Sequence, residues 1–260
     1  MNLLFDPMFR VPFLTGLLLA LSLPQLGLLL SLRREWLATL GIAHLAGAGG
    51  IIGGLLALPA LPAALLAAVA GVTIRSLQPR ASNELYAMMI LAGWSLGLIT
   101  ASLSQDAHGI GQLLVDGQLY FTTRLHLLVA LPLTISLLVC AGFMMRGLLQ
   151  QQLMPTPDYA IRHRQLQWLL SAFLAIGVSL TAMTMGIMAA FALLFVPAWV
   201  ASGIAASWQQ ARWLISGLAL LCYLLAYTIA LLADLPFGPV FVMTLALSGM
   251  LRWLPPRHND

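Results

Sequence analysis

A histidine inside an apolar stretch is the strongest candidate for chemistry in this chain. His44 lies in the run of Ala, Gly, Leu and Ile that follows the charged turn Arg33-Arg34-Glu35. An ionisable side chain within a membrane span is expensive and is by default a functional hypothesis, and neutral imidazole is a common metal ligand. We therefore predict that His44 is a metal or pathway ligand. The alternative is a structural histidine that bonds a nearby carbonyl.

Small residues accompany this histidine at helical spacing. Ala46, Gly50 and Gly54 recur every four residues and so share one face of a helix. Such a face lets another helix approach closely in a membrane. We therefore predict that this helix packs against other helices and lines a transport pathway, and that it does not face lipid.

Two further groups could bind a cation. Met183, Met185 and Met188 offer thioethers where two apolar segments meet, but methionines at this spacing more often fill a core. Asp106 and His108 lie in a polar segment, where they could guide a cation or form a solvated loop pair. Neither group is as strong a candidate as His44.

The sequence excludes most enzymatic chemistry. It contains no His-Glu-x-x-His, no Gly-x-Ser-x-Gly, no phosphate-binding loop and no carboxylate pair within one expected helix. Cys140 and Cys222 stand in separate apolar runs, which argues against a disulfide or a thiolate metal site. We predict that the chain is not an enzyme, so energy from ATP would have to come from another subunit.

Composition defines the class of protein. Of 260 residues, 61% are hydrophobic and 8% are charged, with a mean hydropathy of +0.95. Soluble domains carry about 25% charged residues, and a spanning helix needs roughly 20 apolar residues. The chain is therefore predicted to be an all-α polytopic membrane protein, a single transmembrane domain over 1–260 with about eight or nine helices.

The order of apolar and polar segments predicts where the spans lie. We expect a first helix retained over residues 11–30, and polar loops over 75–83 and 146–165. The next helices are expected at 36–58, then from the prolines at 59 and 62 to about residue 74, and at 84–103 and 125–145. Residues 166–207 should form two helices that meet near Met185-Gly186. One more helix should begin at Arg212, and the last should end at Arg252.

Basic residues predict the orientation. All of them are arginines, and with an outer amino terminus ten of the twelve fall on the inner side. The inner set is Arg33, Arg34, Arg75, Arg80, Arg146, Arg162, Arg164, Arg212, Arg252 and Arg257, while Arg10 and Arg124 fall outside. This is the positive-inside pattern, so the sequence pI of about 9.6 requires no nucleic-acid partner.

Four segments, in this order and spacing, resemble a known family. Residues 32–44 match a basic turn and a helix ending in Ala-His, and residues 94–98 match a Ser-Leu-Gly helix. Residues 157–160 match the start of a cytoplasmic coupling segment, and residues 186–198 match a Gly-to-Pro-Ala run. Over nearly its full length the chain resembles the permeases of zinc- and manganese-uptake ABC transporters of the ZnuB type.

The resemblance implies partners and roles. It implies a homodimer in the bilayer of a bacterial inner membrane, with cytoplasmic ATPase subunits and a periplasmic metal-binding protein. No permanent cofactor is implied; zinc or manganese would be the transported divalent metal, with His44 as its ligand. The residues implied in ATPase coupling are Asp158, Ala160, Arg162, His163 and Arg164.

The chain departs from the family at three positions. Leu40 stands where the family has an Asp one helical turn before the histidine, Ala87 replaces a Gly, and His163 lies near the place of another Gly. The missing carboxylate keeps a second cargo open, such as a metal chelate. A haem-handling membrane subunit, with His44 and another histidine as axial ligands, is an alternative from a different class.

Overall fold

The chain folds into a bundle of apolar helices. The computed structural model describes residues 7–33, 35–78, 83–103, 109, 111, 117, 119–153 and 160–253. Its helices are α1 (Pro7–Arg33), α2 (Trp36–Leu55), α3 (Ala60–Leu77), α4 (Asn83–Ala101), η2 (Leu119–Phe121), α6 (Arg124–Leu153), α7 (Ala160–Met185), α8 (Ile187–Ile204), α9 (Trp208–Ala233), α10 (Phe237–Ser248) and η4 (Gly249–Trp253).

The helices satisfy the requirement that a membrane places on a backbone. In hydrocarbon each N–H and C=O group must be bonded within the protein, which an α-helix achieves by itself. In the part of the chain that the structure describes, eight helices are long and apolar enough to cross a membrane, and the segment Phe237–Trp253 is a shorter apolar helix. The predicted all-α class with eight or nine spans is confirmed.

The expected junction near residue 186 is a single glycine. Gly186 has a φ of 98°, a conformation that side chains with a Cβ rarely adopt. Its N–H still bonds the Ala182 carbonyl at 3.2 Å, and its own carbonyl accepts from Ala190 at 3.0 Å. Because both helices keep their end bonds, α7 turns directly into α8.

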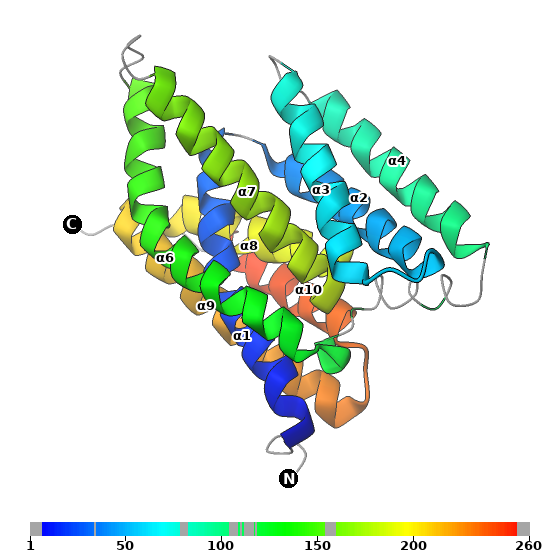
Figure 1. Cartoon of the computed structure of the whole chain (residues 1–260). Helices are drawn as coiled ribbons and strands as arrows, with labels where there is room; N and C mark the ends of the chain where they lie inside the picture. The colour runs from blue at the N-terminus through cyan, green and yellow to red at the C-terminus, as the bar shows by residue number, and fades with distance from the viewer. Residues whose placement is uncertain are drawn as a thin grey trace.

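The helices form two groups joined by α7 and α8 (Figure 1). In the first group α2 packs against both α3 and α4. In the second, α1 packs against α6, α8 and α9, while α10 packs against α8 and α9. Of the candidate spans, α1, α2 and α7 are the most buried, and α3, α4 and α6 are the least.

Polar side chains connect α1 to its neighbours inside the second group. The hydroxyls of Ser22 and Thr134 lie 3.1 Å apart, which links α1 to α6. Gln25 donates to the Ser216 hydroxyl at 2.9 Å and to the Arg212 carbonyl at 3.0 Å, and its side-chain oxygen accepts from the Arg212 Nε at 3.1 Å. These bonds fix the position of α9 against α1 because unpaired polar groups would be costly at this depth.

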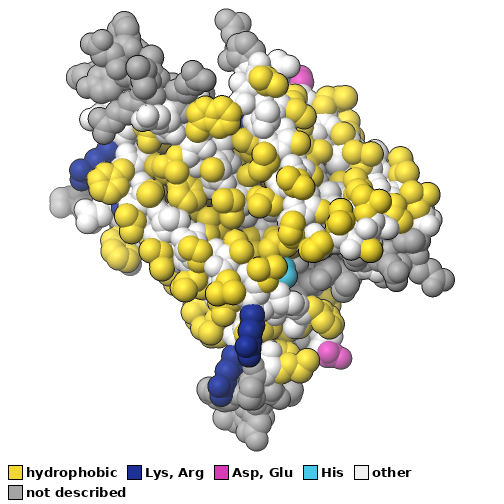
Figure 2. Space-filling model, viewed as in Figure 1, with side chains coloured by type: hydrophobic (Ala, Val, Ile, Leu, Met, Phe, Trp, Pro, Cys, Tyr) yellow, Lys and Arg dark blue, Asp and Glu magenta, His cyan; other side chains and the backbone are white. Residues whose placement is uncertain are grey.

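The arginines separate the two ends of the bundle. Successive spans run in opposite directions, so one end, here named the basic end, holds Arg33, Arg75, Arg146, Arg212 and Arg252. Arg10 and Arg124 lie at the opposite end. Figure 2 shows a broad hydrophobic surface between the ends, with the basic side chains in view at its margins. The distribution agrees with the predicted alternation of the spans.

Several predicted helix ends are wrong. The loop expected over 146–165 is shorter, because α6 continues to Leu153 and α7 begins at Ala160. Residues 146–153 are mostly Leu and Gln, which favour a helix, and the first proline after them is Pro155. The loop expected from Arg75 also begins later, since α3 extends to Leu77. In contrast, α2 ends at Leu55, before the expected residue 58.

Glycine allows α2 and α4 to touch through their backbones. A Cβ at Gly93 of α4 would lie 2.6 Å from the carbonyl carbon of His44, closer than real Cβ atoms approach. On another face of α2, a Cβ at Gly49 would lie 2.5 Å from the Cβ of Ala67 in α3. On the predicted small-residue face, a Cβ at Gly50 would lie 2.6 Å from the side chain of Met183 in α7, so this part of the face is also a packing surface.

We expect Gly93→Ala to lower the thermal stability of the purified protein in detergent. The new methyl group meets backbone and not a flexible side chain, so overpacking should cost about 1–3 kcal/mol. Gly217→Ala is the matched control, because a Cβ there meets no described atom within 4 Å. That control should melt at the parent temperature or above it, since Ala favours a helix. Equal melting temperatures for the two variants would contradict the close packing of α2 and α4.

Candidate metal site

His44 lies near the middle of α2, among the most buried part of the bundle. Its side chain is 8% exposed. The residues around it in α2 are small, so α3 and α4 come close enough to cover the helix on two sides. The packing holds the histidine inside the protein and away from lipid.

The imidazole is oriented by a hydrogen bond to its own helix. Nδ1 of His44 lies 2.9 Å from the carbonyl oxygen of Leu40. A carbonyl only accepts, so Nδ1 is the donor in this bond, and in the neutral form of the ring the Nε2 nitrogen is the one that carries the lone pair. Metal-binding histidines commonly have their second nitrogen fixed in this way. The geometry suits a ligand, and it equally satisfies the structural alternative of a bonded carbonyl.

His44 belongs to no metal-binding cluster of His, Cys, Asp or Glu side chains in the described part of the chain. Among the described residues, no group of three or more His, Cys, Asp or Glu side chains could hold a metal ion. Met183 and Met185 are buried and Met188 is exposed. The Met183 side chain packs against Gly50 of α2, as expected for a core residue. At Leu40 the carbonyl, and not a carboxylate, faces the imidazole.

The remaining candidates have separate positions. Nδ1 of His126 lies 2.8 Å from the Thr123 hydroxyl and 3.2 Å from its N–H, at the start of α6 and therefore at the opposite end from the basic one. Asp106 and His108 lie outside the described residues. Cys222 is buried and its thiol lies 3.7 Å from the Thr244 carbonyl, and both cysteines are free thiols.

Four of the five predicted coupling residues lie at the basic end. Ala160, Arg162, His163 and Arg164 form the first turns of α7. Asp158 and the side chains of residues 160–164 lie outside the described part of the chain. Residues 160–164 therefore begin α7, just before its apolar span Gln165–Met185, and do not lie in the middle of a long loop.

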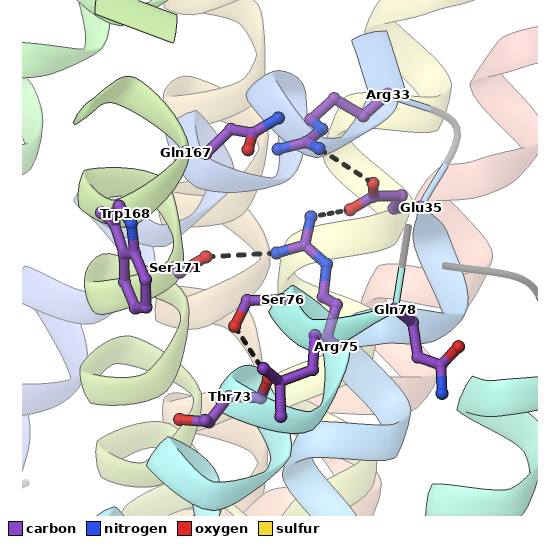
Figure 3. A pocket seen from close by; sticks show the side chains of 10 residues that line it. Arg33, Glu35, Thr73, Arg75, Ser76, Gln78, Gln167, Trp168 and Ser171 are labelled. Carbon is purple, nitrogen blue, oxygen red and sulfur yellow. Dashed lines mark hydrogen bonds and ion pairs between the residues drawn. The ribbon is translucent and has the colours of Figure 1, made fainter. Parts of the chain in front are cut away.

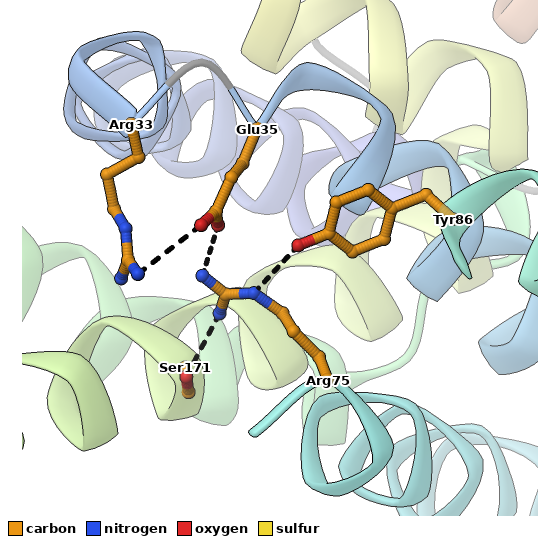
Figure 4. A network of polar contacts seen from close by, with 5 residues as sticks. All are labelled: Arg33, Glu35, Arg75, Tyr86 and Ser171. Atoms are coloured by element: carbon orange, nitrogen blue, oxygen red, sulfur yellow. Dashed lines mark hydrogen bonds and ion pairs between the residues drawn. The ribbon is translucent and has the colours of Figure 1, made fainter. Parts of the chain in front are cut away.

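A polar cluster at the basic end is not apparent from the sequence (Figure 4). Glu35 forms ion pairs with Arg33, at 3.3 Å, and with Arg75. Arg75 is 6% exposed, and it also donates to the Tyr86 hydroxyl at 3.0 Å and to the Ser171 hydroxyl at 3.3 Å. The cluster thus joins α1, the turn before α2, α3, α4 and α7.

The prediction that Arg75 lies in a polar loop is wrong. It lies in the last turns of α3, where its side chain points inward to Glu35. A signal was present in the sequence, since Glu35 is an acid next to two arginines in a chain with few acidic residues. Nothing local indicated that its principal partner would be forty residues away.

Comparison with known proteins assigns the family. The sequence pattern of the ABC 3 transport family matches residues 5–252, nearly the whole chain. This chain belongs to the ABC 3 transport family. The predicted relation to metal-ion ABC permeases is confirmed, and an ABC 3 chain is the membrane component of a transporter, not a catalytic enzyme by itself.

Solved structures show the same fold at low sequence identity. PsaBC from Streptococcus pneumoniae, in complex with a Fab, matches with a TM-score of 0.82 and 17% identity, covering 98% of this chain and 94% of that one. A second match, described as a metal-chelate type ABC transporter in an inward-facing conformation, has a TM-score of 0.71 and 14% identity. It covers 96% of this chain and 87% of the other. No curated protein matches the chain by sequence.

We expect Glu35→Gln to destabilise the ABC 3 chain strongly. The change leaves Arg75 buried without its counter-charge, and breaking a buried pair in this way typically costs about 3–5 kcal/mol. Asp234→Asn is the matched control, because Asp234 is exposed and its left-handed backbone conformation suits Asn. Thermal unfolding in detergent measures both. If Glu35→Gln unfolded at the same temperature as Asp234→Asn, the ion pairs of Glu35 would contribute little to the stability of the protein.

Proposed function

We propose that this chain is the permease subunit of an ABC importer for divalent metal ions, with zinc or manganese as substrate. Membership of the ABC 3 family supports the transport role. The observation that carries the metal assignment is the bond from His44 to the Leu40 carbonyl, because it leaves Nε2 ready to bind a cation. The fold shared with PsaBC is consistent with it.

The proposed subunit is a homodimer in a bacterial inner membrane. Its basic end faces the cytoplasm, as the positive-inside rule favours. Cytoplasmic ATPase subunits bind at the connection between α6 and α7, through Asp158, Ala160, Arg162, His163 and Arg164. A periplasmic binding protein delivers the metal to the opposite end.

A metal chelate is the second candidate cargo, and the residue at position 40 favours it. A bare divalent cation gains most from a hard oxygen ligand beside the imidazole, and Leu40 offers only its backbone carbonyl, already bonded to Nδ1. A chelated ion brings its own ligands and needs fewer from the protein. The fold similarity to a metal-chelate type transporter is compatible with this alternative.

We expect His44→Asn to reduce metal uptake by at least about tenfold in cells that express the full transporter, since even second-shell changes at metal sites cost 10–100-fold. The Asn amide can still donate to the Leu40 carbonyl, so melting temperature and assembly should stay near the parent. His126→Asn, at the start of α6, should transport normally. Normal uptake by His44→Asn would remove the proposed metal site and leave the permease assignment.

A second variant in the same assay separates a bare ion from a chelate. Leu40→Asp restores a carboxylate one turn before His44, so it should increase uptake of free zinc or manganese if a bare ion is the substrate. A buried carboxylate with no cation to pair with costs several kcal/mol. If the cargo is a chelate, the same variant should lose stability and gain no uptake of free ions.

Reversal of two charges tests the ATPase contact. Arg162→Glu combined with Arg164→Glu should dissociate the ATPase subunits or uncouple hydrolysis from transport, while the protein still inserts. Arg146→Glu is the control, because Arg146 is exposed at the same end but lies before the connection. Pull-down of the ATPase and stimulated hydrolysis measure the effect. If the double variant still bound the ATPase subunits and still stimulated their hydrolysis, this segment would not be the ATPase contact.

A further inference from the structure

A pocket of about 620 Å³ lies beside the polar cluster at the basic end (Figure 3). It lies between the α1–α2 turn, the end of α3 and the start of α7. Its polar lining includes Arg33, Glu35, Arg75, Gln78 and Gln167. The volume falls within the range of sites that hold small ligands. The lining chemistry therefore indicates which ligand would fit.

The pocket carries a net positive charge of one, because its lining holds two arginines and one glutamate. Each of the three guanidinium nitrogens of Arg75 already donates a hydrogen bond, to Tyr86, Ser171 or Glu35. Arg33 bonds Glu35 through one nitrogen, and its Nη1 has no acceptor among the described residues. The spare charge and the unfilled donor both belong to Arg33, and both favour an anion with acceptor oxygens.

The pocket lies at the depth where spans end. Arg33 is the last residue of α1, and Leu77 is the last of α3. Trp168, also in the lining, lies near the start of the apolar span of α7. Leu77 is 75% exposed and Trp168 is 52% exposed, so the polar interior has an apolar rim. Tryptophan at this level is typical of the membrane interface.

We propose that this pocket binds the headgroup phosphate of an anionic phospholipid from the cytoplasmic leaflet. The phosphate lies near Arg33, in a lining that also holds the amides of Gln78 and Gln167, and the acyl chains lie along Trp168 and Leu77. A soluble phosphate would leave the apolar rim unused. Acidic lipids are concentrated in this leaflet, where they attract basic residues close to the spans.

Quenching of Trp168 fluorescence tests the proposal. The full chain is placed in phosphatidylcholine nanodiscs that contain either brominated phosphatidylglycerol or brominated phosphatidylcholine, and the Trp168→Phe signal is subtracted. We expect half of the Trp168 fluorescence to be quenched at a several-fold lower mole fraction of brominated phosphatidylglycerol than of brominated phosphatidylcholine. Trp213 is the control, because it is 76% exposed at the same end of the bundle and does not line the pocket. Its fluorescence, obtained by subtracting the signal of Trp213→Phe, should be quenched equally by the two lipids.

Two variants assign the effect to the pocket. Arg33→Gln should remove the preference for phosphatidylglycerol. Gln78→Glu should also remove it by placing a carboxylate in the lining, and Gln78 is exposed, so this variant remains decisive if Arg33→Gln fails to fold. Gln209→Glu adds the same charge at an exposed position of α9 and should keep the preference.

The outcomes are distinct. Equal quenching by both lipids, or an equal preference at Trp213, would overturn the proposal in favour of general attraction to the surface. Loss of the preference on addition of millimolar inorganic phosphate would also overturn it, because the ligand would then be a soluble anion. A preference confined to Trp168, insensitive to phosphate and lost in both pocket variants, would support the lipid site.

Discussion

The close approach of α2 to three neighbouring helices is the constraint on which the rest of the structure depends. In a membrane no hydrophobic force drives helices together, so contact relies on van der Waals packing of small residues. Gly49, Gly50 and Gly93 leave no space for a Cβ, and a methyl group at any of them would require a neighbour to shift. This packing determines the burial of His44, and it brings the ends of α3, α4 and α7 together.

Charge is concentrated where these helix ends meet. Both ion pairs found among the described residues involve Glu35, and they lie at the basic end, not at the depth of His44. A buried pair is stable only when its remaining hydrogen-bonding groups are satisfied, which Tyr86 and Ser171 achieve for Arg75. The cluster therefore connects both helix groups without placing a charge in the hydrocarbon core, and it provides one wall of the pocket.

The metal site proposed at His44 depends on different features from the fold around it. The imidazole is held by a backbone carbonyl, which a substitution of the Leu40 side chain does not remove. Helix packing and the choice of metal ligands are thus partly independent. The packing needs small residues along α2, whereas the proposed ligand set depends on the single side chain at position 40, one turn before His44. If His44 is the metal ligand, the residue at position 40 can change without loss of the bundle.

The sequence by itself determined the features that depend on local composition. Apolar length specified an all-α membrane protein, Gly186 marked the break between two helices, and His44 was identified because an imidazole is unusual in such a stretch. Only the tertiary structure decided the features that depend on distant partners. Arg75 resembled a loop residue until Glu35 was found beside it, and the pocket is formed by residues from three separate segments. Hydropathy and helical period act over a few turns, whereas a buried charge is stable only through the partner that folding brings to it.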